Sequence, residues 1–202
     1  MLKLHFAPKS RAIRAAWMLE EMGLAYELVS YALGDPQMRS PAFRAIHPMG
    51  RVPVLEDGDV RIMESGAILE YLIARHGGSA FGPDPDSPEF PAYLQWMHYA
   101  EGMLMPPVNS YMVETFFLPP ERQSEVHAKR AKKLLGHMLV AVEAALEDRA
   151  YLAGDFSAAD IMTGSAVMSA RTIGVDMSAL PNLTAYIDRL SQRPAYIKAA
   201  AL

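Results

Sequence analysis

Apolar and polar residues alternate at the start of the chain, and this alternation predicts a strand with one buried face over residues 2–6. Apolar positions at helical spacing follow between Ser10 and Gly23, and serine and glycine are typical helix boundaries. Residues 25–31 give a second strand. The favoured topology is therefore a β-α-β unit whose two strands pair in parallel across the helix.

A hairpin is predicted next, because an Asp-Gly pair at residues 57–58 stands between two apolar runs. Residues 53–55 and 60–63 should therefore pair antiparallel. Pro53 has no amide hydrogen to donate to a neighbouring strand, so Val52 is expected at a strand start or edge. The Val52-Pro53 peptide bond is a candidate for the cis form. Such an edge offers main-chain groups to a peptide ligand.

A further helix should begin at Ser65, because apolar residues at helical spacing run from there to the glycines at 77–78. The first amides of a helix have no partner within the helix, and they attract a carboxylate. With a short helix near residues 41–46, residues 1–78 have the order β-α-β-α-β-β-α. This order predicts an α/β first domain.

The rest of the chain shows no strand pattern. Residues 79–87 are rich in proline and glycine and are expected to form a linker. Residues 88–202 are predicted to form an all-α domain, with helices near residues 90–105, 121–148, 157–171, 183–192 and after 193. Pro106-Pro107 is expected to end or kink the first of these helices.

Composition matters mainly through what it excludes. The net charge of −4 argues against nucleic acid as the main partner. No apolar run approaches the ~20 residues that span a bilayer, and the start of the chain lacks signal-peptide features. No membrane partner and a cytoplasmic location are therefore expected. The 202 residues include no cysteine, so a reactive thiol would have to belong to a ligand.

The run from His47 to Leu55, with the Glu64-Ser65 pair after the hairpin, resembles the glutathione S-transferase superfamily. That family carries an N-P-x-G-K-V-P-x-L run with a cis proline, followed by an E/Q-S pair at a helix start. Two positions depart from the pattern, since His47 replaces asparagine and Arg51 replaces lysine. The resemblance implies a thioredoxin-like first domain, an all-α second domain with a hydrophobic substrate pocket, and a two-fold homodimer.

The later part of the sequence extends the resemblance over essentially the whole chain. Residues 154–160, with a Ser-x-x-Asp capping box at 157–160, match a buried capping motif of the family. Residues 181–194 resemble its C-terminal helix pair, and residues 93–107 look most like the fungal-type and related bacterial serine-type branch.

The resemblance also implies a binding site for glutathione as co-substrate, with no cofactor and no metal. In the family, the residue before the cis proline pairs through its main chain with the cysteinyl part of glutathione, and the E/Q-S pair holds the γ-glutamyl end. The glutathione-binding residues implied here are Arg51, Val52, Pro53, Glu64 and Ser65. His98 and Glu101 lie three apart, but no further metal ligands follow at matching spacing.

The family activates the glutathione thiol with a tyrosine, serine or cysteine in the first strand-to-helix turn. Phe6 stands where the tyrosine classes place their phenol, so Ser10 is the candidate hydroxyl, and the charge of Arg11 could stabilise a thiolate. The alternatives are that Ser10 is only a helix cap and that Arg11 is a solvated surface residue.

A pocket for a small hydrophobic electrophile is expected from Phe6, Met103, Tyr111 and Met112, since methionine adapts to varied apolar shapes. Ordinary helical core is the alternative explanation for the same residues. The leading function is transfer of glutathione to such an electrophile, as in detoxification. The alternatives are a glutathione-dependent peroxidase, thiol-disulfide exchange or isomerisation, and a non-catalytic glutathione-binding protein of the same fold.

Overall fold

The computed structural model describes residues 1–202 and divides into two compact units. The first unit comprises Met1–Phe81 together with Ser191–Leu202, and the second comprises Gly82–Leu190. No helix of the structure is both long enough and apolar enough to cross a membrane.

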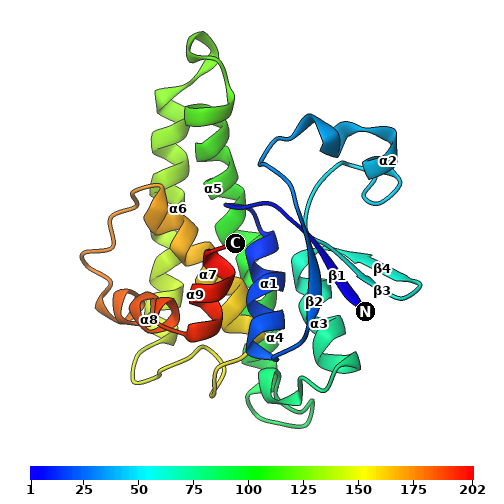
Figure 1. Ribbon diagram of the computed structural model, residues 1–202. Helices are drawn as coiled ribbons and strands as arrows, with labels where there is room; N and C mark the ends of the chain where they lie inside the picture. The colour runs from blue at the N-terminus through cyan, green and yellow to red at the C-terminus, as the bar shows by residue number, and fades with distance from the viewer. The chain divides into compact units, whose positions relative to one another are not determined.

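The first unit is built on a four-stranded sheet in the order β2-β1-β3-β4 (Figure 1). Its strands are β1 Leu2–Phe6, β2 Tyr26–Ser30, β3 Val54–Asp57 and β4 Val60–Met63. Its first helices are α1 Ala12–Glu21, α2 Pro41–Arg44 and α3 Ser65–Arg75, with 3-10 turns at Pro36–Arg39 and Ser79–Phe81. As the sequence predicts, β1 and β2 pair in parallel and β3 pairs antiparallel with β4. The structure adds an antiparallel pairing of β3 with β1.

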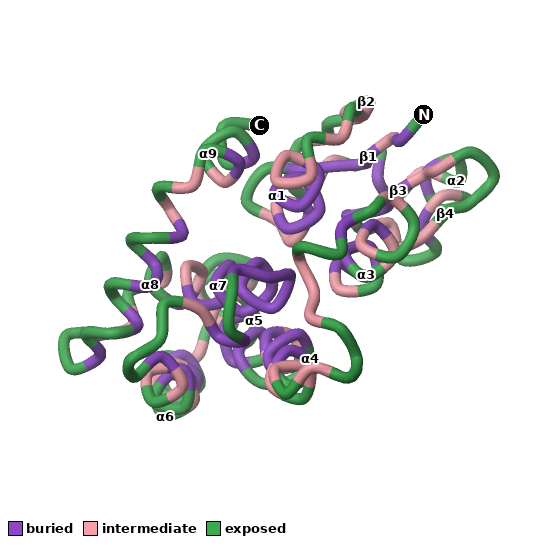
Figure 2. Tube along the Cα trace, turned by 90° about the horizontal axis from the view of Figure 1, so that it is seen from below, coloured by how far each residue is buried: buried purple, intermediate pink, exposed green.

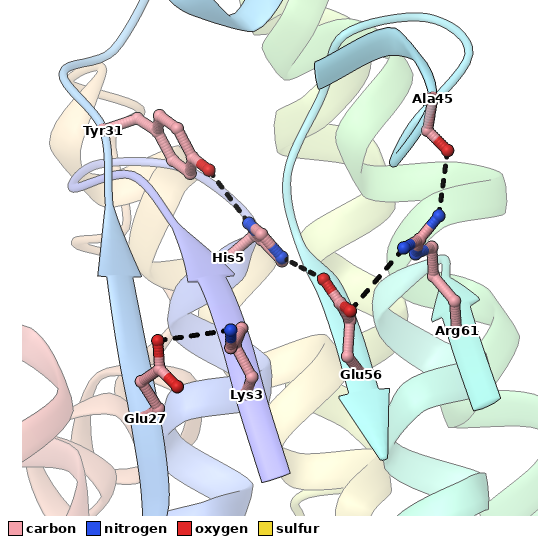
Figure 3. A network of polar contacts seen from close by, with 7 residues as sticks. All are labelled: Lys3, His5, Glu27, Tyr31, Ala45, Glu56 and Arg61. Carbon is pink, nitrogen blue, oxygen red and sulfur yellow. Dashed lines mark hydrogen bonds and ion pairs between the residues drawn. The ribbon is translucent and has the colours of Figure 1, made fainter. Parts of the chain in front are cut away.

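Alternation along β1 gives the two faces of the sheet different surroundings. Leu4 and Phe6 are buried on the face against which α1 and α3 pack. His5 points to the other face, where its ring stacks on Tyr31 and meets Phe43 of α2 edge-on. Polar side chains from neighbouring strands gather around His5 on this second face (Figure 3).

The last residues of the chain return to the first unit. Helix α9 Pro194–Ala200 packs against α1, where the Tyr196 ring meets Trp17 edge-on with 4.8 Å between centroids. Arg193 binds the Glu21 carboxylate through two nitrogens, with Nη2 lying 2.8 Å from Oε2. The sequence-based division placed residues 88–202 in one helical domain, and the structure differs from it for Ser191–Leu202 because of these contacts.

The second unit is entirely helical. Its helices are α4 Phe90–Tyr99, α5 Met105–Met112, α6 Glu125–Ala145, α7 Ala158–Thr172 and α8 Pro181–Ser191. Two π-helical segments, η3 Ala100–Leu104 and η4 Val113–Phe117, follow α4 and α5, and a 3-10 turn lies at Pro120–Arg122. Helix α7 forms the core of this unit, since most of its side chains are buried, whereas α6 is exposed along one side (Figure 2).

The helical backbone continues through Pro106-Pro107. In the preceding π-helical segment, the Met105 amide bonds to the Ala100 carbonyl, five residues back. This wider turn puts the two prolines in the first turn of α5, where a missing amide hydrogen is tolerated. The interruption expected from the sequence therefore takes the form of a change in hydrogen-bond register, and the helix does not end there.

The capping box at the start of α7 is confirmed. Asp160 is fully buried and accepts hydrogen bonds from the Leu152 amide at 3.0 Å, the Ser157 amide at 2.9 Å and the Tyr186 hydroxyl at 2.9 Å. One carboxylate thereby joins the start of α7 to the preceding loop and to α8.

Candidate functional site

Three chain segments meet at one end of the sheet. His5 of β1 is paired with Val54 of β3, and Val54 is paired with Met63 of β4. The turn that follows β1, the residues that precede β3 and the residues that follow β4 therefore lie at the same end of three neighbouring strands. These segments contain all of the residues that the sequence implies for glutathione binding and activation.

The Val52-Pro53 peptide bond is cis. The sequence marks this bond as a candidate for the cis form. Pro53 is buried at the entry to β3, and Val52 is only partly buried. Val52 lies outside the paired register, which begins at Val54, so its main-chain groups stand just before the start of β3, where an extended peptide could pair. Arg51, just before Val52 in the chain, is exposed.

Glu64 and Ser65 form the start of α3. Glu64 is the N-cap residue and has a φ of 73°, a left-handed conformation that is uncommon outside glycine and concentrates at functional sites. Its exposed carboxylate makes no capping hydrogen bond. Ser65 is the first helical residue and is buried, beside first-turn amides that have no partner within the helix. This combination can bind both a carboxylate and an amine.

Arg14, which the sequence patterns did not single out, is a buried neighbour of this helix start. The side chain is 1% exposed, and its Nη1 donates a hydrogen bond to Ser65 Oγ at 3.0 Å. A signal was present in the sequence, because Arg14 lies three and four residues before the apolar Trp17 and Met18. That spacing puts Arg14 on the buried face of α1.

Ser10 lies in the turn between β1 and α1 and is partly buried. Its Oγ donates to the Ala7 carbonyl at 2.7 Å and accepts from the Ala12 amide at 3.1 Å. Lys9, just before it, has a left-handed φ of 59°. These hydrogen bonds hold Ser10 in the turn that leads into α1, whose N-cap residue is Arg11, and the role of Ser10 toward a thiol stays a prediction.

His47, the residue at the asparagine position of the resemblance, is buried in the loop that leads to the cis proline. Its Nδ1 accepts a hydrogen bond from the Met49 amide at 3.1 Å. Burial lowers the pKa of His47 below its usual range, although the nearby Glu64 carboxylate acts in the opposite direction. The bond to Met49 fixes the loop shape that precedes Arg51 and Val52.

The residues expected to line an electrophile pocket fall in different surroundings. The Phe6 ring is 2% exposed and belongs to the core of the first unit. In the second unit, Met103 is 42% exposed on η3, while Tyr111 and Met112 are partly buried on α5. The pocket stays a prediction. No group of three or more histidine, aspartate or glutamate side chains is placed to hold a metal ion.

Comparison with known proteins gives the same family for both halves of the chain. Residues 1–74 match the family described as "Glutathione S-transferase, N-terminal domain", and residues 105–194 match "Glutathione S-transferase, C-terminal domain". Glutathione S-transferase 3 of Schizosaccharomyces pombe is 31% identical over 96% of this chain and 85% of its own length. Glutathione S-transferase 4 of Zea mays is 36% identical over 93% of this chain and 86% of its own length.

Solved structures agree with the sequence relatives. The theta class glutathione S-transferase of Xanthomonas axonopodis pv. citri, with glutathione bound, has a TM-score of 0.86 and 28% identity, covering 100% of this chain and 98% of that protein. A glutathione transferase from Methylococcus capsulatus has a TM-score of 0.86 and 27% identity, covering 100% of this chain and 98% of that protein. The branch suggested by the sequence stays a prediction. The chain belongs to the glutathione S-transferase superfamily.

Proposed function

We propose that this glutathione transferase binds glutathione at the end of the sheet where the three segments meet, and that it activates the thiol for attack on a small hydrophobic electrophile. One observation carries the proposal: the strand register brings Val52 before β3, the Glu64-Ser65 helix start and the Ser10 turn to the same end of the sheet. These segments suit the three parts of the ligand, which are a peptide backbone, a charged γ-glutamyl end and a thiol.

Recognition in this proposal uses complementary groups at each part of glutathione. The cysteinyl amide pairs with the main chain of Val52, which lies outside the paired register. The γ-glutamyl carboxylate binds Ser65 and the first-turn amides of α3, and the exposed Glu64 carboxylate binds the γ-glutamyl amine. Arg51 adds positive charge beside Val52.

Activation requires the site to favour a thiolate over a thiol. A free thiol has a pKa of about 8.5, and lowering it by ~2 units takes about 2.7 kcal/mol of preferential stabilisation of the anion. Ser10 can contribute by turning its hydroxyl from the Ala7 carbonyl to the sulfur, because a hydrogen bond to an anion is stronger than one to a neutral acceptor. Arg11 and the start of α1 add positive charge.

The second substrate is an apolar electrophile in this proposal. Met103, Tyr111 and Met112 offer exposed or partly buried apolar surface on η3 and α5. Methionine adapts its shape to different apolar ligands, so several small electrophiles should be accepted. The chain is further expected to act in the cytoplasm as a two-fold homodimer.

The test is an assay of the purified protein with reduced glutathione and an activated aryl chloride, beside a parallel assay with an organic hydroperoxide. Thioether formation above the spontaneous rate would support conjugation. Hydroperoxide reduction without conjugation would instead support a peroxidase. Glutathione binding with neither activity would contradict both conjugation and peroxidase function.

A further inference from the structure

A buried arginine on α1 contacts the residue that begins α3. Arg14 is 1% exposed, and its Nη1 lies 3.0 Å from Ser65 Oγ. Burying a guanidinium is unfavourable unless strong hydrogen bonds compensate for the lost water. A lysine, methionine or leucine could fill the same volume, so packing alone does not explain an arginine here.

The direction of the hydrogen bond follows from the chemistry of its two partners. A guanidinium has only donors, whereas a serine hydroxyl has one donor and two acceptor lone pairs. Arg14 therefore donates a hydrogen bond to a lone pair of Ser65 Oγ. Toward a carboxylate, Ser65 Oγ is then the donor, through its O–H. The positive charge also polarises the hydroxyl, which strengthens donation to an anion.

We propose that Arg14 is a positioning residue for glutathione: through its hydrogen bond to Ser65, it orients the hydroxyl that binds the γ-glutamyl carboxylate. The inference rests on the proposed function, in which Ser65 binds that carboxylate. The γ-glutamyl end is separated from the thiol by a peptide bond, so Arg14 acts on the binding of glutathione and not on the chemistry at sulfur.

The test combines Arg14→Met and Ser65→Ala with the double variant. Arg14→Met removes the donor and keeps much of the side-chain volume. It should raise the KM for glutathione about tenfold or more, as expected for loss of a charge-assisted hydrogen bond, and leave kcat at saturating glutathione within about twofold. In the Ser65→Ala background the same substitution should add little, because the group through which Arg14 acts is gone.

Two further variants separate positioning from simple loosening of the helix. Met18→Ala alters another fully buried side chain of α1 and should lower the Tm while keeping the KM close to the parental value. Arg14→Lys still offers a charged donor and should recover part of the affinity, whereas Arg14→Gln should not. If Arg14→Met does not fold, the comparison of Arg14→Lys with Arg14→Gln still tests whether Arg14 positions Ser65.

Several results would overturn the inference. These are a parental KM in a folded Arg14→Met, fully additive effects in the double variant, an equal KM rise in Met18→Ala, and equal KM values for Arg14→Lys and Arg14→Gln. A parental KM in Ser65→Ala would instead contradict the glutathione site of the proposed function. A raised KM in Ser65→Ala with a parental KM in the Arg14 variants would contradict only the role of Arg14.

Discussion

The Ser10 hydroxyl donates a hydrogen bond to the Ala7 carbonyl at 2.7 Å, within the turn that leads from β1 into α1. In this position Ser10 orders the turn. By rotation about its C–O bond the same hydroxyl can donate to a sulfur bound in front of the turn. The structural and the catalytic roles of Ser10 are therefore compatible, and kinetics can separate them.

Ser10→Ala should lower turnover at neutral pH by ~10 to 1000-fold, the range for loss of one donor to a developing anion, with a much smaller loss of glutathione binding. Higher pH should restore part of the rate, because more of the bound thiol then ionises without help. The measurement is a pH-rate profile with an absorbance titration of the bound thiolate. Arg11→Ala serves as the comparison. If Arg11→Ala alone lowers turnover and raises the pKa of the bound thiol, the activating role belongs to Arg11 and not to Ser10.

Asp160→Ala should destabilise the fold by about 3 to 5 kcal/mol, since it removes the side-chain acceptor of the buried Leu152 amide and Tyr186 hydroxyl. Chemical denaturation measures the loss. Asp155→Ala, at an exposed position of the same loop, is the control and should stay within about 0.5 kcal/mol of the parent. Similar effects of the two substitutions would argue against the capping role of Asp160.

Arg193→Ala should destabilise the first unit by about 2 kcal/mol, because the largely buried Glu21 carboxylate loses both of its bonds to the guanidinium. Lys198→Ala, on the α9 helix that Arg193 precedes, is a matched control. Lys198 is 71% exposed and pairs with Glu20 at 3.6 Å, so its loss should cost no more than about 0.5 kcal/mol. Hydrogen exchange of α1 amides should rise in Arg193→Ala and not in Lys198→Ala.

Glu56→Gln should change how stability depends on pH. The hydrogen bond from His5 Nε2, at 2.6 Å, holds the pKa of Glu56 below its usual range, with smaller contributions from the charges of Arg61 and Lys3 (Figure 3). A carboxylate with a lowered folded-state pKa stabilises the fold above its unfolded-state pKa, and this stabilisation is lost as the pH falls through the folded value.

The parent should therefore be more stable than Glu56→Gln by about 1 kcal/mol near neutral pH. The difference should shrink below about pH 4.5, where the carboxylate of the unfolded chain is already protonated. Urea titrations at several pH values give both curves. A difference that stays constant from neutral to acidic pH would show that the ionised form of Glu56 is not involved.

Local patterns were enough to predict the elements that hold the site. An Asp-Gly turn at residues 57–58 predicted the hairpin, and Ser65 with its apolar spacing predicted the start of α3. The capping box at Asp160 was equally local. Each of these signals depends on residues close in sequence, so the hairpin, the helix start and the capping box can be predicted without a structure.

Two of the features that the sequence did not predict depend on distant residues. Glu21 and Arg193 are 172 positions apart, so nothing local indicated that α9 packs on α1. Arg14 and Ser65 are 51 positions apart, and an arginine in a helix is exposed by default. The change of register before Pro106-Pro107 also escaped prediction, since proline normally predicts an interruption of the helix.

The central claim is that glutathione binds with its γ-glutamyl end at Glu64 and Ser65. Titration calorimetry with reduced glutathione tests it most directly, comparing the parent with a Glu64→Ala/Ser65→Ala double variant and with Glu70→Ala, an exposed control on the same helix. The double variant should bind at least about tenfold more weakly, while Glu70→Ala should match the parent. Unchanged affinity in a folded double variant would contradict the claim.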